Sequence, residues 1–213
     1  MRVRALFVIV LAVVLGIGVL AQQPPRKPAS PPGTAATQVG GKWVQTKPDA
    51  APSYTGGKWI EVTYGRPILK GRTEIFGKGA DYGKKVNDDA PVWRAGANLT
   101  TRFATEVPLV FGGKTLPAGE YSMFVDLKPG AWTLIFSKQA FQQKYDPNEK
   151  VLTWGAYNYD KAQDVLRVPM TVGASSYSVD QFTIGFIDMT QGGGKLAMWW
   201  EKTMATVAFT VGS

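Results

Sequence analysis

Apolar and polar side chains alternate with a period of two along most of the chain after residue 54. In the stretch 119–127, Tyr121, Met123, Val125 and Leu127 all fall on one face. Alternation of this kind predicts strands with one buried face. The same pattern predicts strands at residues 59–64, 101–107, 131–137, 164–172, 181–189, 195–202 and 203–211, and a short strand at 110–111.

Turns rich in glycine and proline separate these segments. Lys128-Pro129-Gly130 reverses the chain, Gly112-Gly113 opens a hairpin, and Gly192-Gly193-Gly194 is predicted to form a hairpin turn between two of the last three strands. Helical periodicity is confined to residues 73–78 and 138–144. About nine short strands without long helices between them predict an all-β antiparallel β-sandwich with one or two short helices, a barrel being the alternative.

Residues 1–21 have the pattern of a secretory signal peptide. Arg2 and Arg4 precede an uncharged run that ends in Val19-Leu20-Ala21. We therefore expect an exported protein, periplasmic or extracellular. An uncleaved anchor is the alternative, because the run over 5–21 reaches the lower limit of what spans a bilayer, and it is the one way in which we expect contact with a membrane.

Residues 22–53 are predicted to be a flexible linker, which places the β-sandwich domain at 54–213. Seven of the fourteen prolines lie in this stretch, among Ala, Ser, Thr and Gln, and such a composition favours extended, unpacked chain. A sequence of Gly-Gly-Lys-Trp occurs at 40–43 and again at 56–59. We interpret it as a duplicated strand start, since a repeat protein needs at least three units.

The chain contains no cysteine and no histidine. This excludes thiol chemistry, nucleophiles activated by histidine, and zinc, copper or iron sites built on imidazole or thiolate. No cofactor is predicted, although a site for a hard cation made of oxygen ligands alone stays open. The stretch 146–149, Asp-Pro-Asn-Glu, lacks the glycine and the distant glutamate of a calcium loop and is interpreted as a solvated turn.

The formal net charge is +8, of which Arg2 and Arg4 contribute two, so the mature chain is close to +6. An excess of positive charge favours weak attraction to anionic surfaces, and it also serves solubility alone. The basic residues form no long run, so nucleic-acid binding is not expected.

Several short segments of the predicted domain form a recognisable series: residues 64–67 (Tyr-Gly-Arg-Pro), 70–72, 75–77, 92–98 (Val-Trp-Arg-Ala-Gly-Ala-Asn), 116–122, 154–160, 164–168 and 200–203. In this order they resemble the bacterial domain of unknown function family 2911, over roughly residues 54–213. The resemblance implies a bacterial and typically exported protein, and it carries over no catalytic residue. Leu99-Thr100-Thr101 depart from the acidic and small residues that often follow the Trp-Arg motif in the family.

Two loop clusters carry candidate chemistry. The first could form a pocket for an anion or an acidic sugar at one end of the sandwich, because arginine forks fit carboxylate or phosphate and tryptophan offers a stacking face. Alternatively, Arg66 and Arg94 pair with carboxylates inside the domain and fix its loops. The members of this first cluster are Arg66, Lys70, Arg72, Trp93, Arg94 and Asn98.

The second cluster comprises Trp154, Tyr157 and Tyr159, with Asp160 and Asp164 nearby. Aromatic faces beside hydrogen-bonding groups are typical of sugar sites, and the alternative is that these rings pack onto the sheet. In the adjacent pair Trp199-Trp200, the two rings of a strand face opposite sides, so one is expected in the core.

These observations favour a non-enzymatic, exported binding or interaction module for an envelope glycan or another anionic small ligand, with no catalytic residue assigned. One alternative is an enzyme that acts on carbohydrate with carboxylates alone. Its candidates are Glu120, Asp126, Asp160, Asp164 and Glu201, and their spacing enforces no pair. Another is a structural envelope component, which predicts an exposed apolar patch on one sheet.

Overall fold

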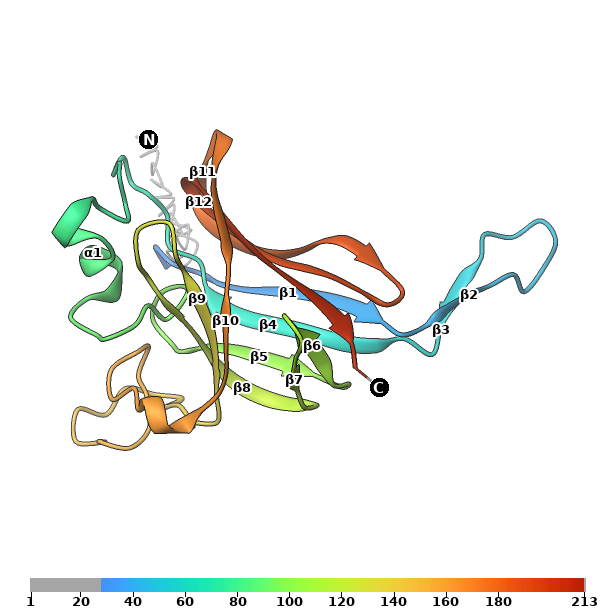
Figure 1. Cartoon of the computed structure of the whole chain (residues 1–213), viewed down its shortest axis with the longest axis horizontal. Helices are drawn as coiled ribbons and strands as arrows, with labels where there is room; N and C mark the ends of the chain where they lie inside the picture. The colour runs from blue at the N-terminus through green and yellow to red at the C-terminus, as the bar shows by residue number, and fades with distance from the viewer. Residues whose placement is uncertain (1–27, 213) are drawn as a thin grey trace, which may run out of the picture.

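Two antiparallel sheets and a projecting hairpin make up the folded chain (Figure 1). The structure is a computed structural model that describes residues 28–212. The predicted signal peptide at 1–21 and residues 22–27 of the predicted linker lie outside the described residues. Within the part of the chain that the structure describes, no helix is long and apolar enough to cross a membrane.

The larger sheet has six strands in the order β1-β4-β5-β8-β9-β10, and each neighbouring pair is antiparallel. Its strands are β1 (Pro32–Val39), β4 (Lys58–Gly65), β5 (Thr101–Thr105), β8 (Gly119–Asp126), β9 (Thr133–Ser137) and β10 (Asp164–Pro169). Buried residues alternate with half-buried ones along β5 and along β4 from Ile60 to Tyr64, as the period of two predicts.

The smaller sheet has four strands in the order β11-β12-β6-β7. Its strands are β6 (Leu109–Phe111), β7 (Lys114–Leu116), β11 (Thr171–Thr190) and β12 (Gly193–Val211). The predicted strands at 195–202 and 203–211 are one continuous strand, β12. Its register against β11 shifts on both sides of Glu201, where β11 carries the extra residues. A bulge of this kind disturbs the pairing without ending the strand. The predicted hairpin is confirmed, but its turn is Gln191-Gly192 rather than 192–194, because Thr190 pairs with Gly193, the first residue of β12.

Strand β1 corrects the predicted linker. Residues 32–39 pair with β4 along their whole length, from Pro32 opposite Gly65 to Val39 opposite Lys58. The prolines dominate the composition of 22–53, but residues 33–47 contain none, so this stretch can donate backbone N–H groups to a sheet. The sheet therefore begins at Pro32, ahead of the predicted domain boundary.

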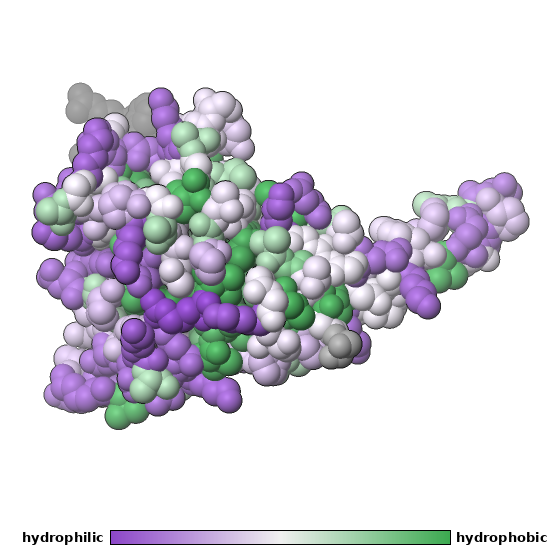
Figure 2. All heavy atoms as spheres, viewed as in Figure 1, coloured by the Kyte–Doolittle hydropathy of each residue, from purple (hydrophilic) through white to green (hydrophobic). Residues whose placement is uncertain are grey.

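A hairpin arm formed by β2 (Lys42–Val44) and β3 (Ser53–Thr55) continues the β1–β4 pair outward and stands clear of the body (Figures 1 and 2). Gly40 and Gly56 interrupt the two sides of the ladder with the same positive φ of 70°. The two Gly-Gly-Lys-Trp copies flank this interruption, and each begins a strand as predicted, β2 and β4.

The arm is expected to be dispensable for folding. Replacing residues 42–55 by a short glycine-rich turn should lower the melting temperature by only a few degrees, because these residues are exposed except for the half-buried Tyr54. Thermal unfolding of the shortened protein followed by circular dichroism measures this. A loss of cooperative unfolding would show instead that the arm is part of the folding unit.

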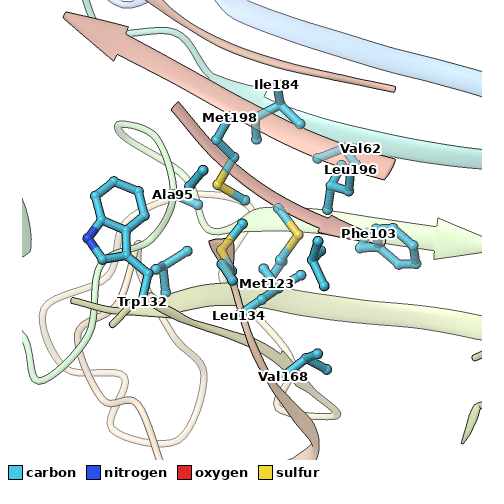
Figure 3. Packing of buried hydrophobic residues seen from close by; sticks show 14 of the residues in the cluster. Val62, Ala95, Phe103, Met123, Trp132, Leu134, Val168, Ile184, Leu196 and Met198 are labelled. Atoms are coloured by element: carbon cyan, nitrogen blue, oxygen red, sulfur yellow. The ribbon is translucent and has the colours of Figure 1, made fainter. Parts of the chain in front are cut away.

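The core lies between the two sheets. Val62, Phe103, Met123 and Leu134 of the six-stranded sheet face Ile184, Leu196 and Met198 of the other sheet (Figure 3). At one end the core becomes aromatic, and this aromatic cluster comprises Phe76, Trp93, Trp132, Phe182 and Trp200. The two facing sheets and their antiparallel pairing confirm the predicted all-β sandwich.

The helical segments lie at other positions than predicted. Residues 73–78 and 138–144 are not helical, and the helical turns are η1 (Gly79–Asp81), α1 (Lys84–Asn87) and η2 (Lys161–Gln163). Glu74 and Gly77 adopt positive φ, which a right-handed helix does not allow. The N–H of Gln142 donates to the carbonyl of Thr153 (2.8 Å) rather than to the preceding turn of a helix.

Candidate functional site

A polar cavity of about 360 Å³ opens beside the aromatic cluster, where the loops after β4 and before β5 meet. We call it the basic pocket. Its charged and polar side chains are Arg72, Lys85, Asp88, Arg94 and Asn98. Trp93 and Trp200 also contribute to its wall.

Positive charge is in excess around the basic pocket. Three cationic side chains, Arg72, Lys85 and Arg94, face one carboxylate, Asp88. The Arg72 guanidinium donates to the carbonyls of Leu69 and Ile68 (2.8 Å each). Within residues 28–212, neither Arg72 nor Lys85 has a carboxylate partner. Two cations are therefore left to bind an anion from solution.

Arg94 is buried and held on several sides. It is 8% exposed, its Nη1 donates to the carbonyl of Asn98 (3.1 Å), and its Nη2 lies 3.6 Å from Oδ2 of Asp88. Its guanidinium also lies 5.6 Å from the ring centroid of Tyr157. The structure thus agrees with the alternative in which Arg94 pairs with a carboxylate and fixes loops, while it still lines the pocket.

The backbone around the basic pocket is strained. Asp88, Asp89, Ala95 and Asn98 have φ between 47° and 64°, a region that costs an L-residue about 1–2 kcal/mol. Hydrogen bonds hold the strained segment in place, since the hydroxyl of Thr101 donates to the carbonyl of Ala95 (3.0 Å). Strain of this kind concentrates at functional sites, which supports the interpretation of these loops as a site.

Arg66 and Lys70, the remaining cations of the first predicted cluster, do not line the basic pocket. The side chain of Arg66 lies against Gly33 of β1, and its buried Nε has no partner among the described residues. Lys70 is exposed with a φ of 52°. The loop at 66–72 therefore contributes one of its three cations, Arg72, to the pocket.

Trp93 belongs to the core rather than to a ligand platform. It is 1% exposed and stacks on Trp200 with a centroid distance of 6.2 Å and an angle of 7°. Phe182 packs against it at 4.9 Å. The stacking role predicted for Trp93 is therefore not available, because neighbouring rings cover its faces.

The second predicted cluster splits into two places. Trp154 and Tyr157 line a cavity of about 180 Å³ with Tyr145, whose ring centroid lies 5.4 Å from that of Trp154. The Tyr157 hydroxyl donates to Oδ2 of Asp88 (2.7 Å), and this hydrogen bond raises the pKa of Tyr157. Tyr157 thus connects this cavity to the basic pocket through Asp88.

Tyr159 belongs to an internal ionic network instead. Its ring packs against Phe124 at 5.1 Å, and its hydroxyl donates to Oδ2 of Asp164 (2.7 Å). Burial, reinforced by Asp164, raises the pKa of Tyr159. Arg167 completes the network by pairing with Asp164 and Asp126 (2.8 Å each). For Tyr159, the structure therefore agrees with the alternative interpretation, in which the ring packs onto the sheet and does not form a sugar site.

The other candidate carboxylates also have structural partners. Glu120 lies 3.5 Å from Nε of Arg102, and Glu201 accepts the N–H groups of Glu74 (2.6 Å) and Ile75 (3.0 Å). No group of three or more acidic side chains able to hold a metal ion occurs among the described residues.

Lys85 and Asp88 are members of the basic pocket that the sequence interpretation missed. Lys84 precedes Lys85, and Asp89 follows Asp88, so the sequence shows two pairs of like charges on a polar segment. Charged pairs of this kind normally belong to a solvated face. The short helix α1 decides which lysine faces the pocket, and no sequence signal distinguishes the two.

Two antiparallel sheets around an aromatic core, with a basic pocket at one end, define an all-β sandwich domain of the antiparallel class. Residues 47–209 match the family model described as "Protein of unknown function (DUF2911)", and the chain belongs to this family. The match confirms the resemblance found in the sequence motifs. No curated protein and no solved structure shows significant similarity to the chain.

Proposed function

We propose that the protein is an exported, non-enzymatic module that binds an anionic small ligand in the basic pocket. The observation that carries this proposal is the charge of the lining: three cationic side chains and one carboxylate surround a cavity of about 360 Å³. Arg72 and Lys85 supply unpaired charge, Arg94 fixes the loops, and a cavity of this size suits a small ligand. An acidic sugar of the cell envelope fits this chemistry.

Export rests on the signal-peptide pattern of residues 1–21. The non-enzymatic assignment rests on the pocket itself. Glycoside hydrolysis with carboxylates needs two of them across a cleft. In the described part of the chain, Asp88 is the one carboxylate that lines the basic pocket.

Lys85→Ala is expected to weaken anion binding about tenfold or more, because a charge-assisted contact contributes about 1.5–3 kcal/mol. The probes are inorganic phosphate, sulfate and glucuronate, with glucose as the neutral comparison. The shift of the melting temperature with probe concentration gives the affinity.

Lys84→Ala is the matched control, because Lys84 lies in the same helix and pairs with Asp81 at the surface (2.9 Å). It should bind the anions like the unmodified protein. If both variants lose the same affinity for the anions, the effect comes from the overall net charge and not from the position of Lys85. A protein whose melting temperature responds to none of the three anions would refute the proposal.

A further inference from the structure

A second cavity of about 290 Å³ lies directly beside the basic pocket. We call it the apolar pocket. Ser30, Ala97 and Asn98 line both cavities, so the two share a wall. Most of the remaining lining is apolar, and it includes Pro32, Leu99 and Phe141.

Three polar side chains of the apolar pocket, Tyr64, Thr100 and Arg102, already have partners within the protein. The hydroxyl of Tyr64 bonds to the backbone N–H of Ile184 (2.8 Å). Arg102 lies between Glu61 (3.4 Å) and Glu120 (3.5 Å), and the hydroxyl of Thr100 donates to the carbonyl of Gly155 (2.8 Å). The surface that is left for a ligand is therefore mostly hydrocarbon, and it favours an apolar occupant.

Asn98 lies in the wall that the two cavities share. Its side-chain Nδ2 donates to the carbonyl of Ser30 (3.1 Å), and its own carbonyl accepts from Arg94 of the basic pocket (3.1 Å). Leu99, the next residue, lines the apolar pocket and is 38% exposed. A ligand that fills both cavities across this boundary needs charge at one end and hydrocarbon at the other.

We infer that the ligand is an amphipathic anion, a phosphate or carboxylate that carries an alkyl or aryl tail. The head group lies near Arg72 and Lys85, and the tail lies against Leu99 and Phe141. This inference rests on the proposed function, because it assigns the anionic end to the same basic pocket. It adds the apolar half of the ligand.

The length of the ligand's alkyl tail tests the inference. Isothermal titration of the purified protein with inorganic phosphate and with butyl, hexyl, octyl and decyl phosphate, all below their micellar concentrations, compares one head group with growing tails. Each buried methylene should tighten binding by up to about fourfold, the equivalent of about 0.8 kcal/mol, until the pocket is full. Alkyl carboxylates should show the same trend.

Leu99→Ser should flatten this dependence on chain length while leaving the affinity for inorganic phosphate unchanged. Val151→Ser is the matched control, because Val151 is an exposed apolar residue (72%) that does not line the apolar pocket. It should behave like the unmodified protein.

The outcomes separate this inference from the proposed function. If phosphate binds but longer tails add nothing, the inference fails and the proposed function stands. If no anion binds, with or without a tail, both fail. If decanol binds as tightly as decyl phosphate, the anionic head is irrelevant and the inference of an amphipathic anion is overturned.

Discussion

Trp200→Ala is expected to lower the free energy of unfolding by about 3–5 kcal/mol, as for other buried tryptophans truncated to alanine. Trp200 is 4% exposed and contacts Trp93, Phe76 and Phe182 at centroid distances of 5.8–6.2 Å. Its removal leaves a cavity at the aromatic end of the core, and the structure around a truncated core residue relaxes only in part. Equilibrium unfolding in urea measures the loss.

The neighbouring substitution Trp199→Ala is the control. Trp199 is half-buried on the opposite face of β12, where its ring lies over Gly185. We expect a loss of about 1 kcal/mol, typical of a partly exposed site. If Trp199→Ala costs as much as Trp200→Ala, the assignment of faces along β12 is wrong.

Trp199 and Trp200 show what the alternation along a strand can predict. Because successive side chains in a strand point to opposite faces, the pattern predicts one core ring and one outer ring. The same alternation also indicates which ring is which, because Trp200 shares its face with Leu196 and Met198, and Trp199 shares its face with charged residues. The structure agrees, since Leu196, Met198 and Trp200 are buried.

Pairing between segments far apart in the chain explains the errors in the strands. Short alternating segments were predicted well, as for β4 and β8. Strand β12 was predicted as two strands, because a shift of register and a chain break disturb the alternation in the same way. Residues 173–180 of β11 were not predicted as strand, and the predicted strand at 164–172 joined β10 to the first residues of β11. Strand β1 was missed because its pairing with β4 is set by tertiary contact, and its own residues are mostly small or polar.

The candidate site was predicted in part. Arg72, Arg94 and Asn98 meet because the loops at 66–72 and 93–98 leave the same end of the six-stranded sheet. Composition suggested an anion site but could not separate a cation that faces the pocket from one that faces Gly33, as Arg66 does. That distinction depends on side-chain direction at irregular backbone, for which the sequence has no period.

Gly155→Ala is expected to destabilise the protein by about 2–5 kcal/mol and to weaken anion binding. Gly155 has a φ of 63°, which costs an alanine about 1–2 kcal/mol. A Cβ there would also lie 2.6 Å from Cζ of Arg94, and such overpacking costs about 1–3 kcal/mol more. Arg94 cannot move aside without leaving Asn98 and Asp88, so the strain passes into the basic pocket.

Gly130→Ala separates the two causes. Gly130 has a nearly equal φ of 68°, but nothing lies within 4 Å of a Cβ added there. It should therefore lose about 1–2 kcal/mol and bind inorganic phosphate normally. The effect of alanine on the unfolded chain is common to both variants and cancels in their difference. Urea unfolding and phosphate titration of the two proteins thus measure what the contact between Gly155 and Arg94 contributes. Equal losses would mean that Arg94 can move freely and does not organise the pocket.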